Sequence, residues 1–157
     1  MNISYRLKKK ELILLLDLFG DAEKLEQNFG NVYIDRDEYT VLSEALHRKG
    51  FVTLSGNSIS AEGVISFMME TVYSASLVFA DEKSECWIYC TPEIMIYIRV
   101  NTAGGLEYLL SAVSDAEDRD MLTEKISDRQ FRIIRGGSGN TDGADLVSFA
   151  EAYEYEK

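Results

Sequence analysis

A period of two residues between positions 77 and 100 constrains this chain more than any other feature. Three segments (77–80, 85–90 and 94–100) alternate side chains between two faces, and short connections at 81–83 and 91–93 separate them. This period is that of a β-strand, and segments so closely spaced pair as neighbours. The sequence therefore predicts a three-stranded antiparallel meander.

The predicted meander has one aliphatic face and one aromatic face. The aliphatic face carries Ile94, Ile96 and Ile98, and the aromatic face carries Trp87, Tyr89 and Tyr97. Because Trp and Tyr are enriched at interface hot spots, we expect the aromatic face to bind a partner. The alternative is that the chain's own C-terminal helix covers this face.

Helices are predicted before and after the meander. The clearest spans 35–49, where Asp35 is the expected N-cap and Glu38 completes a capping-box pattern. Apolar residues at helical spacing predict further helices over 11–19, 61–73 and 116–126. Residues 106–113 fit a helix or a fourth strand, and we favour the strand because a sheet already exists to accept it; 130–134 reads as a last strand.

These elements predict an α+β fold in one domain over residues 1–135. We expect an antiparallel sheet of four to five strands, with helices packed mainly on one face and an N-terminal half that is helical. Residues 136–157 contain a glycine-rich loop, GGSGNTDG, followed by a C-terminal segment. We expect this segment to be a docking helix or to be partly disordered.

The net charge of −11 limits the classes of partner. Nucleic-acid binding depends largely on Lys and Arg contacts with phosphates, so we expect neither a nucleic acid nor an anionic membrane surface as partner. The acidic group Asp115, Glu117, Asp118 and Asp120 is either a solvated helix start or a docking patch for a basic partner. The chain has no run of eighteen apolar residues and no signal-peptide pattern, which favours a cytoplasmic location.

No set of residues predicts catalysis, a metal site or a cofactor. His47 is the only histidine and lies at a predicted helix end. Cys86 and Cys90 are four residues apart on one face of a strand, where zinc sites need closer pairs. The glycine-rich stretch lacks the Gly-Lys-Ser/Thr ending of a phosphate-binding loop. We therefore expect a protein that is not an enzyme.

The order helix 35–49, hairpin 51–59, helix 61–73 is typical of a winged helix-turn-helix domain. A transcription regulator is thus one alternative, but residues 61–73 contain no Lys or Arg that could contact phosphates. If this shape is present, we expect a version of it that binds protein.

The element order over roughly 7–125 also resembles EspG-type chaperones of type VII (ESX) secretion systems. The resemblance depends on the N-terminal leucine-rich helix, the phrase Leu46 to Val52 (LHRKGFV), the helix opening at Ile59-Ser60-Ala61-Glu62, and the meander from Leu77. It implies a cytoplasmic chaperone that holds a secreted helical hairpin, and it transfers no functional residue.

We therefore expect a non-enzymatic protein-binding accessory or chaperone-like protein, with a basic or helical protein as its partner. The alternative binding function is an immunity protein that neutralises a basic toxin, since acidic surfaces suit basic partners.

Overall fold

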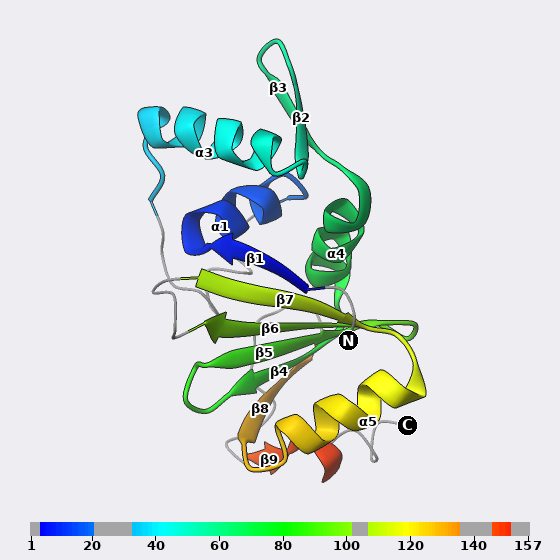
Figure 1. Ribbon diagram of the computed structural model, residues 1–157. Helices are drawn as coiled ribbons and strands as arrows, with labels where there is room; N and C mark the ends of the chain where they lie inside the picture. Colours follow the sequence, from blue (N-terminus) through cyan, green and yellow to red (C-terminus); the bar gives the residue numbers. More distant parts are fainter. Residues whose placement is uncertain (1–3, 21–32, 102–106, 136–145, 152–157) are drawn as a thin grey trace.

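A seven-stranded antiparallel sheet forms the centre of the molecule (Figure 1). The computed structural model describes residues 4–20, 33–101, 107–135 and 146–151. The strand order in the sheet is β1-β7-β6-β5-β4-β8-β9, and a separate two-stranded sheet is formed by β2 and β3. The strands of the large sheet are β1 (Ser4–Lys8), β4 (Leu77–Asp81), β5 (Cys86–Cys90), β6 (Met95–Asn101), β7 (Glu107–Val113), β8 (Gln130–Arg135) and β9 (Val147–Ser148).

The helices lie on both faces of this sheet. On one side lie α1 (Lys9–Asp17), α3 (Arg36–Arg48) and α4 (Gly63–Ser74), together with the hairpin of β2 (Val52–Ser55) and β3 (Ser58–Ala61). On the other side lies α5 (Ala116–Lys125), next to β8 and β9 (Figure 1). The predicted meander is present as β4, β5 and β6, and residues 107–113 form the strand β7.

The predicted fold class is wrong in three respects. The large sheet has seven strands instead of four to five, because β1, β8 and β9 extend it beyond the meander and β7. Helices cover both faces instead of mainly one, since α5 packs opposite α1 and α4. The N-terminal half is not a helical block, because β1, β2 and β3 alternate with its helices.

Two buried clusters lie on opposite faces of the sheet. The first combines α1 and α4 with side chains of the central strands, including Trp87, Tyr89, Ile96 and Ile98. The second lies under α5 and includes Cys86, Ile88, Tyr97, Leu122 and Phe149. All five residues of β5 are buried, so this strand is sandwiched between the two clusters.

The predicted aromatic face does not exist as one surface. In the pairing of β5 with β6, Trp87 lies opposite Ile98 and Tyr89 opposite Ile96, while Tyr97 pairs with Ile88. Directly paired residues point to the same face of a sheet. Trp87 and Tyr89 therefore share the aliphatic face, and Tyr97 points to the opposite one.

The C-terminal part of the described chain joins the second cluster. Val147 and Ser148 pair with Phe131 and Gln130 of β8. The Phe149 ring contacts Phe79 and Phe131 at centroid distances of 5.1 and 6.4 Å. The predicted boundary at 135/136 and the glycine-rich loop that follows it lie outside the described residues.

Candidate functional site: a groove between α3 and the β2–β3 hairpin

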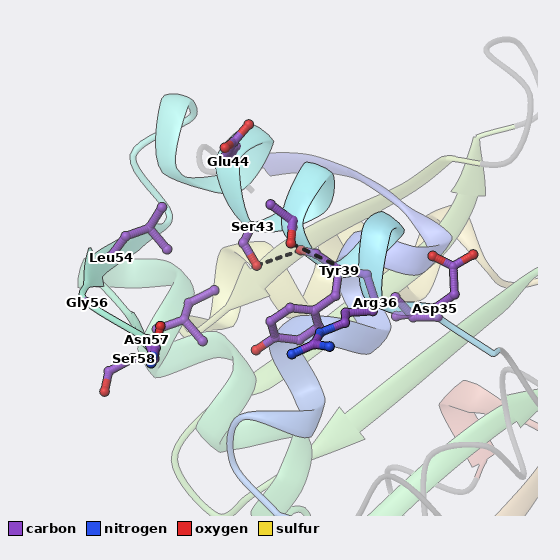
Figure 2. A pocket seen from close by; sticks show the side chains of 12 residues that line it. Asp35, Arg36, Tyr39, Ser43, Glu44, Leu54, Gly56, Asn57 and Ser58 are labelled. Atoms are coloured by element: carbon purple, nitrogen blue, oxygen red, sulfur yellow. Dashed lines mark hydrogen bonds between the residues drawn. The ribbon is translucent and has the colours of Figure 1, made fainter.

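A groove of about 640 Å³ separates one flank of α3 from the β2–β3 hairpin (Figure 2). This pair of elements stands at the end of the molecule away from α5 (Figure 1). Both polar and apolar side chains line the groove, among them Arg36, Tyr39, Ser43, Leu54, Asn57 and Ile59.

The hairpin supplies an apolar wall because its sequence alternates. Val52 pairs with Ala61, and Leu54 pairs with Ile59, so these four side chains point to one face. The residues between them are hydroxyl-bearing and lie on the other face: Thr53, Ser55, Ser58 and Ser60. The hairpin is therefore amphipathic along its whole length.

The apolar face of the hairpin is buried at its base and exposed toward its tip. Val52 is 2% exposed and belongs to the first cluster, whereas Leu54 is 37% exposed. Ile59, opposite Leu54, is half-buried and packs against the first cluster, so within this pair only Leu54 extends past the core. The last apolar pair of the hairpin, Leu54 and Ile59, forms part of the groove wall.

The flank of α3 supplies the second wall. Arg36, Tyr39 and Ser43 follow one another at the spacing of three and four residues that places side chains on one helix face. The Tyr39 side chain is 41% exposed, and Figure 2 shows it extending toward the hairpin residues Asn57 and Ser58. The Ser43 hydroxyl donates its hydrogen bond to the Tyr39 carbonyl oxygen at 2.7 Å, so its proton is already used within α3.

The first turn of α3 is fixed by its N-cap, as predicted. The Asp35 carboxylate accepts a hydrogen bond from the Glu38 N–H at 2.8 Å, and this backbone bond lowers the pKa of the Asp35 carboxyl. Glu38 also forms an ion pair with Lys10 of α1. The Asp35 carboxyl therefore stays ionised at this end of the groove, where Arg36 also lies.

The other end of α3 is joined to the hairpin and to α1. His47 Nδ1 donates a hydrogen bond to the Val52 carbonyl oxygen at 3.1 Å. Lys49 Nζ lies 2.8 Å from Oε1 of Glu11, a carboxylate that is 1% exposed. Because both contacts hold α3 against its neighbours, the two groove walls are positioned by the core.

Exposed apolar side chains gather on this side of the molecule. Among the described residues, seven large apolar side chains are exposed, and six of them lie between positions 33 and 67: Tyr33, Tyr39, Val41, Leu54, Val64 and Phe67. The seventh, Met121, lies on α5. Of these residues, Tyr39 and Leu54 line the groove.

The aromatic residues predicted to bind a partner are all buried. Trp87, Tyr89 and Tyr97 are 4%, 1% and 4% exposed. Trp87 packs near Tyr108 at a centroid distance of 6.1 Å, and Lys125 of α5 lies 5.7 Å from the centre of the Tyr97 ring. In this structure these three residues stabilise the core, and none of them is displayed to a partner.

The predicted acidic residues lie at the start of α5. Asp115 is the N-cap and accepts a hydrogen bond from the Asp118 N–H at 2.8 Å. Asp115, Glu117 and Asp120 are exposed, and Asp118 is half-buried. This position complements the positive end of the helix dipole. The structure thus separates the acidic group from Trp87 and Tyr89, which lie on the other face of the sheet.

Tyr39, Leu54 and Ile59 were not predicted as site residues from the sequence. Tyr39 belongs to the apolar stripe of its helix, and such a stripe predicts burial. A signal was present in the hairpin, where apolar and hydroxyl residues alternate on both strands. That alternation predicts an apolar face but cannot show where the core stops covering it.

The site offers contacts for binding. Among the residues that the structure describes, no three His, Cys, Asp or Glu side chains converge where they could hold a metal ion. No described helix has the length and apolar character needed to cross a membrane.

Searches of protein-family models, curated proteins and solved structures found no match to this chain.

Proposed function

We propose that this chain is a non-enzymatic, cytoplasmic protein-binding accessory, chaperone-like in action, that holds part of another protein in the groove between α3 and the hairpin. The observation that carries the proposal is the exposed end of the apolar hairpin face. Leu54 is 37% exposed and continues a face whose base is buried, next to Ile59, which is half-buried against the first cluster. Tyr39 stands across the groove from this pair. A partner side chain placed there would complete the packing that the core begins.

Tyr39 is well suited to be an anchor for this partner. Tyr brings a large contact area at a small cost in side-chain entropy, and it is enriched at hot spots. Its backbone is held by α3, and α3 is held by the Glu11–Lys49 ion pair and the His47–Val52 hydrogen bond. Because the wall is preformed, little binding energy would be lost in ordering it.

The charges around α3 favour a protein over a nucleic acid as the partner. Helix α3 and the hairpin have the order of a recognition helix and a wing, but residues 36–44 of α3 hold three carboxylates, Asp37, Glu38 and Glu44, and one base, Arg36. The other basic residues of α3, His47 and Arg48, lie in its last turn. Phosphates would be repelled by this helix. The element order shared with EspG-type chaperones motivates the further proposal that the partner is a type VII secretion substrate.

Co-purification from the source cell with matched variants tests this function. We expect the recovery of a protein that is enriched with the wild type to fall about thirtyfold with Tyr39→Ala and with Leu54→Ser, since truncating a hot spot costs about 2 kcal/mol or more. Met121→Ser is the matched control, because Met121 is also an exposed apolar residue but lies on α5.

Melting temperatures of the same variants decide how a loss of binding is interpreted. Unchanged melting of Leu54→Ser, together with lost co-purification, supports the groove. If the same protein co-purifies equally with both groove variants, the groove is not the binding site and the proposal fails.

A further inference from the structure

The shape of the groove indicates how its occupant binds. Leu54 and Ile59 are direct cross-strand partners, so the hairpin turns the face of its two strands toward α3. An added strand would pair with the edge of a sheet through backbone hydrogen bonds, whereas a face offers side-chain contacts. A segment that presents a row of side chains fits such a wall better than an extended strand does.

The length of the groove matches a short helix. Its α3 wall runs from Asp35 to Glu44, which is about 13 Å at 1.5 Å per residue. A helix places side chains at positions i, i+3, i+4 and i+7 along one line over a similar length. Two to three turns of an amphipathic helix would therefore span the wall, with their apolar side chains over Tyr39, Leu54 and Ile59.

The charges of the groove set the charge of this helix. Asp35 and Glu44 mark the two ends of the α3 wall, and Arg36 is the one base among the lining residues. Asp37 and Glu38 line a different hollow, and Glu38 is paired with Lys10. The groove itself therefore holds two carboxylates and one guanidinium, and residues 53–60 of the hairpin carry no charge. The chain as a whole has a net charge of −11, so its field also attracts cations.

We propose that the occupant of the groove is a basic amphipathic helix of the partner protein. Its apolar side chains pack between Tyr39 and the Leu54–Ile59 pair, and Lys or Arg residues at its ends lie near Asp35 and Glu44. This inference depends on the proposed function, because it assigns the chemistry of the partner at the same groove.

Three synthetic peptides of equal length test the inference by fluorescence anisotropy with the full chain. The first is a helix former with Leu at i, i+3 and i+7 and Lys at both ends, and the second has Glu in place of each Lys. The third keeps the Lys and Leu content of the first but alternates with Thr and Val to favour an extended strand. We expect the first to bind at least tenfold more tightly than the others and to weaken as salt is raised.

Variants of the protein link this binding to the groove. Leu54→Ser and Tyr39→Ala should each weaken the Lys-Leu helix roughly tenfold, and Glu44→Lys should reduce the difference between the Lys and Glu peptides. Met121→Ser should leave all affinities unchanged. An equal loss with Met121→Ser, or no loss with either groove variant, would show non-specific attraction to an acidic protein and overturn the inference.

The remaining outcomes separate this inference from the proposed function. Tighter binding of the Glu helix or of the extended peptide, still lost in Leu54→Ser, overturns the basic helix and leaves the groove as a binding site. If no peptide binds while a cellular partner still depends on Tyr39 and Leu54, the helix is again wrong and the function stands. If neither the peptides nor any cellular partner depends on the groove, both proposals fail.

Discussion

The two sides of the sheet bury their central strands equally well, but they differ in what they leave exposed. On the α5 side, one helix, a short strand and Phe149 close the second cluster, and Met121 is the one exposed large apolar side chain of the described part of that helix. On the other side, α1 and α4 close the first cluster, and α3 with the hairpin forms a further layer that exposes Tyr39, Val41 and Leu54. This layer contributes Leu46 and Val52 to the first cluster on its inner side and exposes apolar side chains on its outer side, as a binding surface requires.

The largest expected effect on stability comes from the buried aromatic residues on the side of the sheet that α1 and α4 cover. Trp87→Ala should lower the free energy of unfolding by about 3–5 kcal/mol, since it removes a side chain that is 4% exposed and leaves a cavity. Urea unfolding followed by circular dichroism measures this loss. If the variant kept its stability but lost a co-purifying partner, Trp87 would be an interface residue. The binding site would then be assigned to Trp87 and not to the groove.

Each side of the sheet also holds one buried carboxylate paired with a partly exposed base. Glu11 pairs with Lys49 on the side of α1 and α3, and Asp81 pairs with Arg129 at 2.8 Å on the side of α5. Lys49→Met and Arg129→Met should each cost about 2–3 kcal/mol, because each leaves a buried charge without its partner while solvent reaches the site. Double variants with Glu11→Gln or Asp81→Asn should recover part of the loss. An unchanged urea midpoint in the single variants would contradict the prediction.

The Lys49 and Arg129 variants also compare the two sides functionally. Lys49 holds α3 against α1, so Lys49→Met should weaken binding in the groove as well as stability. Arg129 joins Asp81 and Glu85 near the β4–β5 turn, away from the groove. Arg129→Met should therefore reduce stability alone, and equal losses of binding in both variants would mean that binding simply follows stability.

Sequence patterns identified the elements better than they identified the faces. The N-cap Asp35, the meander and the strand over 107–113 were all predictable, because capping residues and period-two alternation act locally. The side of the sheet to which Trp87 points was not predictable, since β5 is buried on both sides and has no polar face to orient it. Its orientation depends on the register with β6, which the connection between the strands sets.

The candidate site could be predicted only in part for a related reason. The sequence showed a helix followed by a hairpin, and that unit is present as α3, β2 and β3. Whether Tyr39 and Leu54 are buried depends on how far α1 and the rest of the core extend beneath them, and this is a property of the assembled fold. The strand β1 was missed because its five residues run directly into α1 and include Arg6 and Lys8.

Most of the buried groups that titrate at alkaline pH lie on the α5 side of the sheet; on the other side, burial raises the pKa of Tyr108. Burial raises the pKa of Cys86 and of Cys90 to about 12, and that of Tyr97 to about 12, and all three lie in the second cluster. The native state therefore keeps protons that the unfolded state loses from about pH 9 upward. Stability is complete below that pH and falls as the pH rises toward 12.

Cys90→Ala isolates one part of this alkaline loss. Burial alone raises the pKa of the Cys90 thiol to about 12. Near pH 10 the unfolded chain has lost the thiol proton that the native state keeps, which should account for about 1 kcal/mol of the decline relative to neutral pH. The variant should show a shallower fall of the urea midpoint between about pH 8 and pH 10. Parallel declines in wild type and variant would show that Cys90 titrates normally.

The smallest expected effect compares two positions on the same hairpin face. Val52 and Leu54 lie on β2 two residues apart and point the same way, but they are 2% and 37% exposed. Val52→Ala should cost about 1–2 kcal/mol, because its methyl groups belong to the core. Leu54→Ala should cost less than about 0.5 kcal/mol, as is usual for exposed positions. Thermal unfolding of both variants beside the wild type measures the difference. If Leu54→Ala proved as costly as Val52→Ala, the chain itself would cover this face, and the wall assigned to a partner would belong to the core.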